Sequence, residues 1–241
     1  KVGVQMAEEN KRIGLHFNFA PVLDINTNPK NPIIGFRSFG ESKTNVSNKA
    51  IALMKGVQEQ GVFSTGKHFP GHGDTSADSH YTLPLVNFSK ERIDNIELYP
   101  YKKLFDEGLV SVMVGHLNIP SLETKENYPS SASYNVVTNV LQNQLGFDGL
   151  IITDGLAMKG ASNFKGPGDL ELAVLLAGND ILLCPENVPV AMTKLEASYS
   201  QGVITEERLA HSVKKILRYK FKSGLNSPKP VEITNLISDI N

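Results

Sequence analysis

Short apolar runs alternate with helical patterns along most of this sequence, and this alternation constrains the fold more than any other feature. Each run is rich in Val, Ile, Leu or Phe and ends in a polar residue or glycine, which is typical of parallel strands buried on both faces. Strands are predicted at residues 17–25, 62–69, 110–117, 149–155 and 180–185. The pattern therefore predicts an α/β fold with a parallel sheet.

Helical segments fill the intervals between these runs. Helices are predicted at residues 44–60, 89–107, 133–145, 169–177, 188–201 and 205–222. Ser89 and Thr205 stand at N-cap positions, while Gly61, Gly108 and Gly146 stand where helices are expected to end. The helices thus separate the strands as parallel pairing requires.

The number of predicted strands leaves two architectures open. A closed (β/α)₈ barrel needs eight strands, and the sequence indicates five. The fold is either an open sheet or a TIM-type (β/α)₈ barrel that lacks its first strands in this chain. Residues 1–225 are predicted to form this one domain, and residues 226–241, with Pro228 and Pro230, a linker or docked C-terminal tail.

The composition excludes several classes of function. Lys and Arg number 24 against 25 Asp and Glu, a balance unsuited to a protein that neutralises nucleic-acid phosphates or anionic lipid. No apolar run approaches the ~18 residues that a membrane span needs. Cys184 is the one cysteine, so no internal disulfide is possible. Composition indicates neither the oligomeric state nor the compartment.

Polar residues stand at the ends of four predicted strands. Asp24 closes the first strand, Lys67 and His68 the second, His116 the third and Asp154 the fourth. Because the carboxyl ends of parallel strands line one face, we expect these side chains to gather there. Taken singly, each is equally consistent with a helix cap or a buried, hydrogen-bonded side chain.

The densest group of reactive side chains is the segment 67–80, KHFPGHGDTSADSH, with three histidines, two aspartates and one lysine. His72, Asp74, Asp78 and His80 have spacings found in metal sites, but all four belong to one loop and match no zinc motif. A second interpretation needs only two of them. Asp78 would orient one nitrogen of the His80 imidazole while the other nitrogen exchanges a proton with a substrate. The plain alternative is a histidine that packs under its own loop.

Asp154 follows a buried apolar run and precedes Gly155. A carboxylate at the mouth of a strand can attack the anomeric carbon of a sugar, provided that another group protonates the leaving oxygen. Asp154 is therefore a candidate nucleophile, and a helix N-cap is the alternative that its position leaves open.

Four motifs together resemble glycoside hydrolase family 3, and more narrowly its β-N-acetylglucosaminidase branch. They are KHFPGHGDTSADSH, GFRSFGES at 35–42, APVLDI at 20–25 and IITDGLAMKG at 151–160, within a resemblance that covers about residues 1–225. The resemblance implies a TIM-type barrel and a retaining mechanism, with Asp154 as nucleophile and His80, paired with Asp78, as acid/base.

The resemblance also implies a set of substrate-binding residues. They are Arg37, Lys67 and His68, and Asp24 and His116 at neighbouring strand ends are predicted to join them. Two features depart from the family pattern. Gly155 stands where many relatives have a second acid or a bulkier residue, and the family's two opening strands with their acidic, glycine-rich segment are not found in this sequence.

The function expected from these residues is that of a retaining, exo-acting β-N-acetylglucosaminidase. Its carbohydrate substrate would carry terminal β-linked N-acetylglucosamine, as in peptidoglycan fragments or chitooligosaccharides, and the mechanism needs no cofactor or metal. Three alternatives remain. An imidazole acid/base does not repel phosphate, so the enzyme could be a phosphorylase; it could be a β-glucosidase of the same family; or the domain could be a non-catalytic sugar-binding module.

Overall fold

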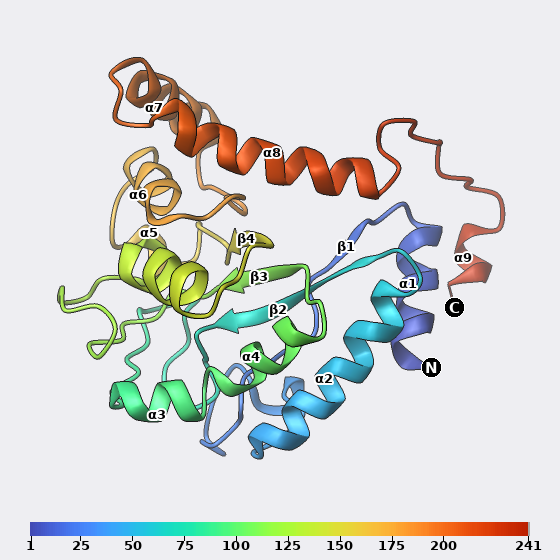
Figure 1. The fold of residues 1–241 in the computed structure, drawn as a ribbon, viewed down its shortest axis with the longest axis horizontal. Helices are drawn as coiled ribbons and strands as arrows, with labels where there is room; N and C mark the ends of the chain where they lie inside the picture. The colour runs from blue at the N-terminus through green and yellow to red at the C-terminus, as the bar shows by residue number, and fades with distance from the viewer. Residues whose placement is uncertain (241) are drawn as a thin grey trace.

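The computed structural model describes residues 1–240 and contains a four-stranded, fully parallel sheet (Figure 1). The strands lie in the order β1 (Phe17–Asn18), β2 (Phe63–Phe69), β3 (Ser111–Val114) and β4 (Leu150–Thr153). A bridge between Ile152 and Ile181 places the next segment beside β4. The predicted α/β class with a parallel sheet is confirmed, and the sheet does not close on itself within the described residues.

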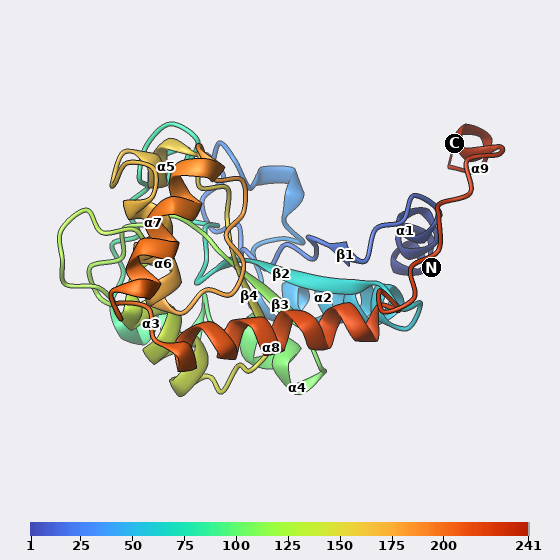
Figure 2. The same cartoon turned by 90° about the horizontal axis from the view of Figure 1, so that it is seen from above.

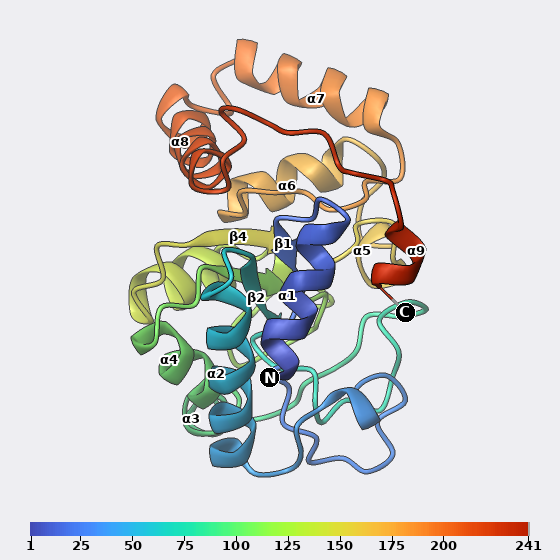
Figure 3. The ribbon, with the colours of Figure 1, turned by 90° about the vertical axis from the view of Figure 1, so that its right-hand side faces the viewer.

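Helices cover both faces of the sheet (Figure 1). They are α1 (Val2–Arg12), α2 (Lys43–Gln58), α3 (Lys90–Asn95), α4 (Tyr99–Asp106), η3 (Asn135–Gln144), α5 (Lys159–Ser162), α6 (Asp169–Ala177), α7 (Val188–Ser200), α8 (Glu206–Lys222) and α9 (Leu236–Asp239), with short 3₁₀ turns at η1 (Gly35–Arg37) and η2 (Ser130–Ala132). Figure 3 shows α6, α7 and α8 on the side of the sheet opposite α2 and α4. Among residues 1–240, no helix combines the length and apolar character needed to cross a membrane.

The helix predicted at 89–107 is in fact two helices, α3 and α4. Pro100 lies in the first turn of α4. A proline has no N–H to donate and its ring clashes with the carbonyl four residues earlier, so one continuous helix could not pass through this position. The segment 133–145 is helical as predicted, but residues 135–144 form the wider π type of turn.

Two predicted strands are shorter than the sequence suggested. The strand predicted at 17–25 is β1 plus a bridge between Val22 and Lys67, and Pro21 interrupts the ladder because it has no N–H to donate. The strand predicted at 180–185 is reduced to the bridge at Ile181. Cys184 adopts a positive φ of 46°, which ends the extended backbone there.

The main apolar core lies between the sheet and the helices α2, α4 and η3. Every residue of β3 and β4 is buried, and Val112, Val114 and Ile151 pack in one cluster with Phe69 and Tyr101. Burial on both faces explains why these strands are continuous apolar runs rather than alternating ones. This rigid sheet fixes the positions of the residues that follow each strand.

The end of the described chain packs against its beginning. Arg12, at the end of α1, donates to Asp239 Oδ2 at 2.9 Å, to the Thr234 carbonyl at 2.7 Å and to the Glu232 carbonyl. Figure 2 shows α9 beside α1, at the far end of the molecule from α5. The division into a domain ending at residue 225 and a separate tail stays a prediction.

Candidate active site

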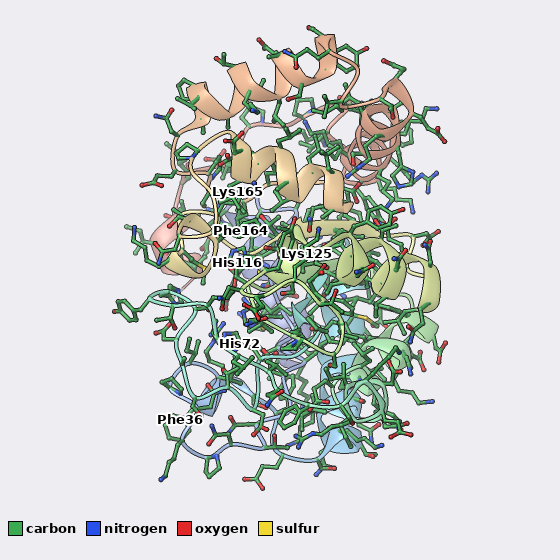
Figure 4. The ribbon with its side chains drawn as sticks, turned by 90° about the vertical axis from the view of Figure 1, so that its left-hand side faces the viewer. Phe36, His72, His116, Lys125, Phe164 and Lys165 are labelled. Atoms are coloured by element: carbon green, nitrogen blue, oxygen red, sulfur yellow. The ribbon has the colours of Figure 1, made fainter. Side chains whose placement is uncertain are left out.

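A cavity of about 190 Å³ lies at the carboxyl end of the strands, the end that faces the viewer in Figure 4. Its polar side chains come from the carboxyl end of β2, from η1 and from the segments that follow β2 and β4, and apolar side chains complete the wall. The lining residues are Phe19, Ile33, Arg37, Lys67, His68, His72, Ser79, His80, Met113, Asp154 and Leu183. Of the eight predicted site residues, five therefore share this one cavity: Arg37, Lys67, His68, His80 and Asp154.

The buried carboxylate of Asp24 orients the His68 ring by a hydrogen bond. Asp24 is 1% exposed, and its carboxylate accepts hydrogen bonds from the His72 backbone N–H at 2.7 Å and from His68 Nδ1 at 2.7 Å. Burial alone would raise the pKa of Asp24, but the charge and hydrogen bonds of His68, together with those of His72, bring it below its ordinary value. Because Nδ1–H of His68 donates to Asp24, Nε2 is the ring nitrogen left for other contacts, and it lies 3.4 Å from Arg37 Nη2.

Two cationic side chains lie around the strand ends. Burial lowers the pKa of Lys67, and the neighbouring Arg37 guanidinium lowers it further, while Asp154 and Asp24 act in the opposite direction. The charges of Arg37, Asp154 and Asp24 therefore all act on the Lys67 ammonium group. Such an arrangement can donate several hydrogen bonds to the hydroxyls of a bound sugar.

Asp154 directly follows β4. Its Oδ1 accepts from the Gly155 N–H at 2.8 Å. Burial raises the pKa of Asp154, but His68, His116, the Gly155 N–H and Lys67 outweigh this and leave the pKa below its ordinary value. The side chain is therefore an ionised carboxylate at neutral pH, as a nucleophile requires.

Asp78 and His80 form a hydrogen-bonded pair on the loop after β2. Asp78 Oδ1 lies 2.7 Å from both the backbone N and the Nδ1 of His80. Desolvation raises the pKa of Asp78, but the hydrogen bonds and charge of His80, with the charge of His72, together leave it below its ordinary value. The contact fixes the proton on Nδ1, and the imidazole lines the same cavity as Asp154. The predicted pairing thus exists in the structure.

Two predicted substrate-binding residues, Asp24 and His116, lie one layer behind the cavity. His116 is fully buried, with Nδ1 2.7 Å from Ser131 Oγ and Nε2 3.1 Å from the Gly155 carbonyl oxygen. Burial lowers its pKa, so the ring is neutral at pH 7. Neither side chain lines the cavity: Asp24 contacts His68, and His116 contacts the residue after Asp154. Direct contact of either side chain with substrate stays a prediction.

His72 is a cavity residue that the sequence suggested only as a metal ligand. It is 1% exposed; its Nδ1 lies 2.6 Å from Thr75 Oγ1 and its Nε2 lies 3.2 Å from Ser79 Oγ. The sequence feature linked to this position is Gly73, the residue after His72. A Cβ at Gly73 would lie 1.9 Å from the Ile25 carbonyl oxygen, so only glycine fits there. Glycine at 73 allows the two backbones to touch, and this contact brings His72 inward.

The four side chains considered as a metal site do not converge. His72 and Asp78 are engaged as described above, and Asp74 lies 3.4 Å from an Arg92 guanidinium nitrogen. Across residues 1–240, no three His, Cys, Asp or Glu side chains are grouped so as to hold a metal ion. Instead, His72 is hydrogen-bonded to Thr75 and Ser79, Asp78 is hydrogen-bonded to His80, and Asp74 forms an ion pair with Arg92.

Comparison with known proteins identifies the family of this chain. Residues 1–219 match the model of the glycosyl hydrolase family 3 N-terminal domain. The chain is 33% identical to β-hexosaminidase A of Pseudoalteromonas piscicida, over 92% of this chain and 40% of that protein. It superposes with a TM-score of 0.91 on a family 3 β-N-acetylglucosaminidase from Paenibacillus sp. str. FPU-7, at 35% identity over 99% of this chain and 49% of the other.

A β-glucoside phosphorylase has an equally similar fold, with a TM-score of 0.92 and 28% identity over 98% of this chain and 44% of the other. The chain spans about half or less of the length of these relatives. The family match covers most of the chain, so the chain belongs to glycosyl hydrolase family 3, as the motifs predicted.

Proposed function

We propose that this protein is a retaining, exo-acting β-N-acetylglucosaminidase. The observation that carries the proposal is that the ionised carboxylate of Asp154 and the Asp78-oriented imidazole of His80 line one cavity. Relatives named β-hexosaminidase and β-N-acetylglucosaminidase support the choice of an acetamido sugar. The substrate would be a glycan with terminal β-linked N-acetylglucosamine, such as a peptidoglycan fragment or a chitooligosaccharide.

In the first step, protonated His80 donates its Nε2 proton to the glycosidic oxygen while Asp154 attacks the anomeric carbon. The C–O bond to the leaving group breaks, and a glycosyl ester forms on Asp154. Asp154 Oδ1 already accepts from the Gly155 N–H, so we assign the attack to Oδ2. The imidazolium loses its charge in this step and becomes the base for the next.

In the second step, neutral His80 removes a proton from water, and the water oxygen attacks the same anomeric carbon. The ester to Asp154 breaks, which releases the sugar with its original configuration and restores both groups. Asp78 keeps the imidazole in the required tautomer throughout. Arg37, Lys67 and His68 are proposed to bind the sugar hydroxyls through both steps.

We also propose that the sheet is part of a (β/α)₈ barrel. Within residues 1–240, β1 pairs with β2 alone and Ile181 pairs with β4 alone, so the sheet is open at both edges. The parallel strand order and a site at the carboxyl ends of the strands are what such a barrel requires.

The proposal is tested by the release of 4-nitrophenol from its N-acetyl-β-glucosaminide and its β-glucoside. Asp154→Ala and His80→Ala should each lower turnover of the acetamido substrate by about a thousandfold or more. Azide should restore turnover of Asp154→Ala and give the glycosyl azide of inverted configuration, since azide replaces the missing nucleophile. His211→Ala, on α8, is the matched histidine control.

Other outcomes favour the alternatives. Faster cleavage of the glucoside would indicate a β-glucosidase. Release of a sugar 1-phosphate when phosphate is added would indicate a phosphorylase, which the similar β-glucoside phosphorylase fold makes worth testing. Sugar affinity without turnover, unchanged in Asp154→Ala, would indicate a binding module.

A further inference from the structure

Arg92, on helix α3, connects the loop that carries His80 to a buried carboxylate outside the cavity. Figure 1 shows α3 at the end of the molecule toward which β2 and β3 point. The guanidinium carbon of Arg92 lies 3.5 Å from the centre of the Phe88 ring, so the planar group stacks on an aromatic face. Arg92 Nε donates to Glu97 Oε1 at 3.3 Å, and Nη2 lies 3.4 Å from Asp74 Oδ2. One guanidinium therefore joins the loop after β2 to the chain between α3 and α4.

Glu97 is the fixed end of this bridge. It is 9% exposed, and a Cβ added at Gly71 would lie 3.0 Å from the Glu97 Cβ, so the loop backbone packs directly on this side chain. Burial raises the pKa of Glu97, its own backbone N–H and Arg92 lower it, and Asp74 raises it, which leaves the pKa above its ordinary value. The Arg92 cation thus lies between two carboxylates that would repel each other without it.

Asp74 belongs to the anchored first half of the loop. His72 and Thr75, close to it in the chain, are buried, with His72 Nδ1 2.6 Å from Thr75 Oγ1. The same imidazole contacts Ser79 through its other nitrogen, directly before His80. The His80 side chain is itself 58% exposed. Its position therefore depends on how firmly the first half of the loop is held.

We propose that Arg92 is a positioning residue for the acid/base, which acts on His80 through Asp74 and the loop and not through the substrate. The cavity is lined by other residues. Without the cation, Asp74 would face Glu97 with no counter-charge, and the loop would hold the imidazole less accurately at the leaving oxygen. The role of His80 in this inference rests on the proposed function. The hold of Arg92 on the loop rests on the contacts alone.

The test uses two substrates that differ in their need for an acid. The leaving sugar of chitobiose must be protonated, whereas N-acetyl-β-glucosaminyl fluoride loses fluoride with little help. The values of kcat/KM are measured for both substrates with Arg92→Gln, Arg92→Lys, Asp74→Asn and the double variant Arg92→Gln/Asp74→Asn. Lys90→Gln is the matched control, because Lys90 is an exposed cation of the same helix that pairs with Asp94 at 2.6 Å.

We expect Arg92→Gln and Asp74→Asn each to lower kcat/KM for chitobiose by about tenfold, and for the fluoride by less than about twofold. The double variant should lose little more than either single variant, since both remove one contact. Arg92→Lys, which keeps the charge without the planar fork, should recover part of the loss, and Lys90→Gln should change neither value. Equal losses on the two substrates would overturn the inference, because a general weakening of the fold does not distinguish leaving groups.

Hydrogen exchange of residues 71–81 tests the hold on the loop without any turnover. Exchange should be several times faster in Arg92→Gln than in the unaltered protein and unchanged in Lys90→Gln. Unchanged exchange in Arg92→Gln would also overturn the inference. If the unaltered protein cleaves neither substrate while exchange responds as expected, the proposed hydrolase fails and the hold of Arg92 on the loop stands.

Discussion

His72 Nε2 lies 3.2 Å from Ser79 Oγ, and this contact joins the residues beneath the cavity to the loop that carries His80. The backbone N–H of His72 donates to Asp24, whose carboxylate also holds His68. One hydrogen-bonded chain thus runs from His68 through Asp24 and His72 to Ser79, the residue next to His80. Burial lowers the pKa of His72, so the ring is neutral at pH 7 and can accept at one nitrogen while donating at the other.

Loss of this contact is expected to slow catalysis without removing a reacting group. His72→Ala and Ser79→Ala should each lower kcat by about tenfold, because the loop then holds His80 less accurately. The double variant should lose less than the two single effects combined, with a coupling energy of about 0.5–1.5 kcal/mol. Steady-state kinetics on the acetamido substrate measure all four proteins. Fully additive effects would show that the contact does not position the loop.

Asp154, the proposed nucleophile, should remain ionised in mildly acidic solution. The pKa of Asp154 is below its ordinary value of 3.8, so protonation removes the nucleophile only as the pH falls through that range. We expect covalent labelling of Asp154 by a 5-fluoro-N-acetylglucosaminyl fluoride to proceed at a constant rate from about pH 5 to 7. Fluoride leaves without much help from an acid, so this rate reports on Asp154 rather than His80. A labelling rate that halves near pH 6 would contradict the assignment.

A buried ion pair fixes α8 to the sheet and should dominate the stability of that region. Lys215 Nζ lies 3.2 Å from Asp180 Oδ2 and donates to the Gly149 carbonyl at 2.9 Å, with both side chains almost fully buried. Lys215→Met leaves the Asp180 charge without its partner, which is expected to lower the free energy of unfolding by about 3–5 kcal/mol. Urea denaturation measures the loss.

The control for this experiment is an ion pair on the protein surface. Lys55 and Glu107 form a surface ion pair, and Lys55→Met should change the free energy of unfolding by less than about 1 kcal/mol. Asp180→Asn/Lys215→Met should recover part of the stability lost in Lys215→Met alone. Similar small losses at the buried and exposed sites would show that the buried pair is not coupled in this way.

Arg12 is expected to hold residues 232–239 on α1. Arg12→Ala removes the ion pair with Asp239 and the two bonds to backbone carbonyls, so proteinase K should cleave after residue 225 several times faster. Lys11→Ala, the adjacent basic residue, is the control. Mass spectrometry of the fragments locates the cuts, and equal cleavage of all three proteins would exclude this role for Arg12.

The sequence predicted the parallel sheet because its strands are buried on both faces and stand out as apolar runs. The predicted strand ends were wrong at Pro21 and Cys184, where the backbone cannot continue the ladder. The helices α3 and α4 were predicted as one helix, although Pro100 separates them. These errors have a common cause, since burial pattern reports which face is apolar but not which backbone groups can pair.

The sequence likewise predicted the part of the candidate site that lies on the strands, but not the part that depends on loop packing. Asp154, Lys67 and His68 lie at the ends of their strands, so the pattern placed them together. The contact between His72 and Ser79 and the buried position of His116 depend on how loops pack on one another, for which local sequence has no periodic signal. The apolar wall of the cavity, which includes Met113 and Leu183, was missed for the same reason.

Helix α5 is only four residues long, yet the segment around it begins at Asp154, the proposed nucleophile, and its backbone holds the loop that carries His80. Within residues 154–160 the chain supplies the carboxylate proposed to attack and the N–H groups of Lys159 and Gly160, which donate to the carbonyls of His80 and Ser79. Two properties of the site, its proposed nucleophile and the backbone support of the loop that carries His80, are therefore encoded in one contiguous stretch. Exchanging this stretch between relatives would transfer both properties together, whereas replacing only one part of it would separate the acid/base from the support that places it.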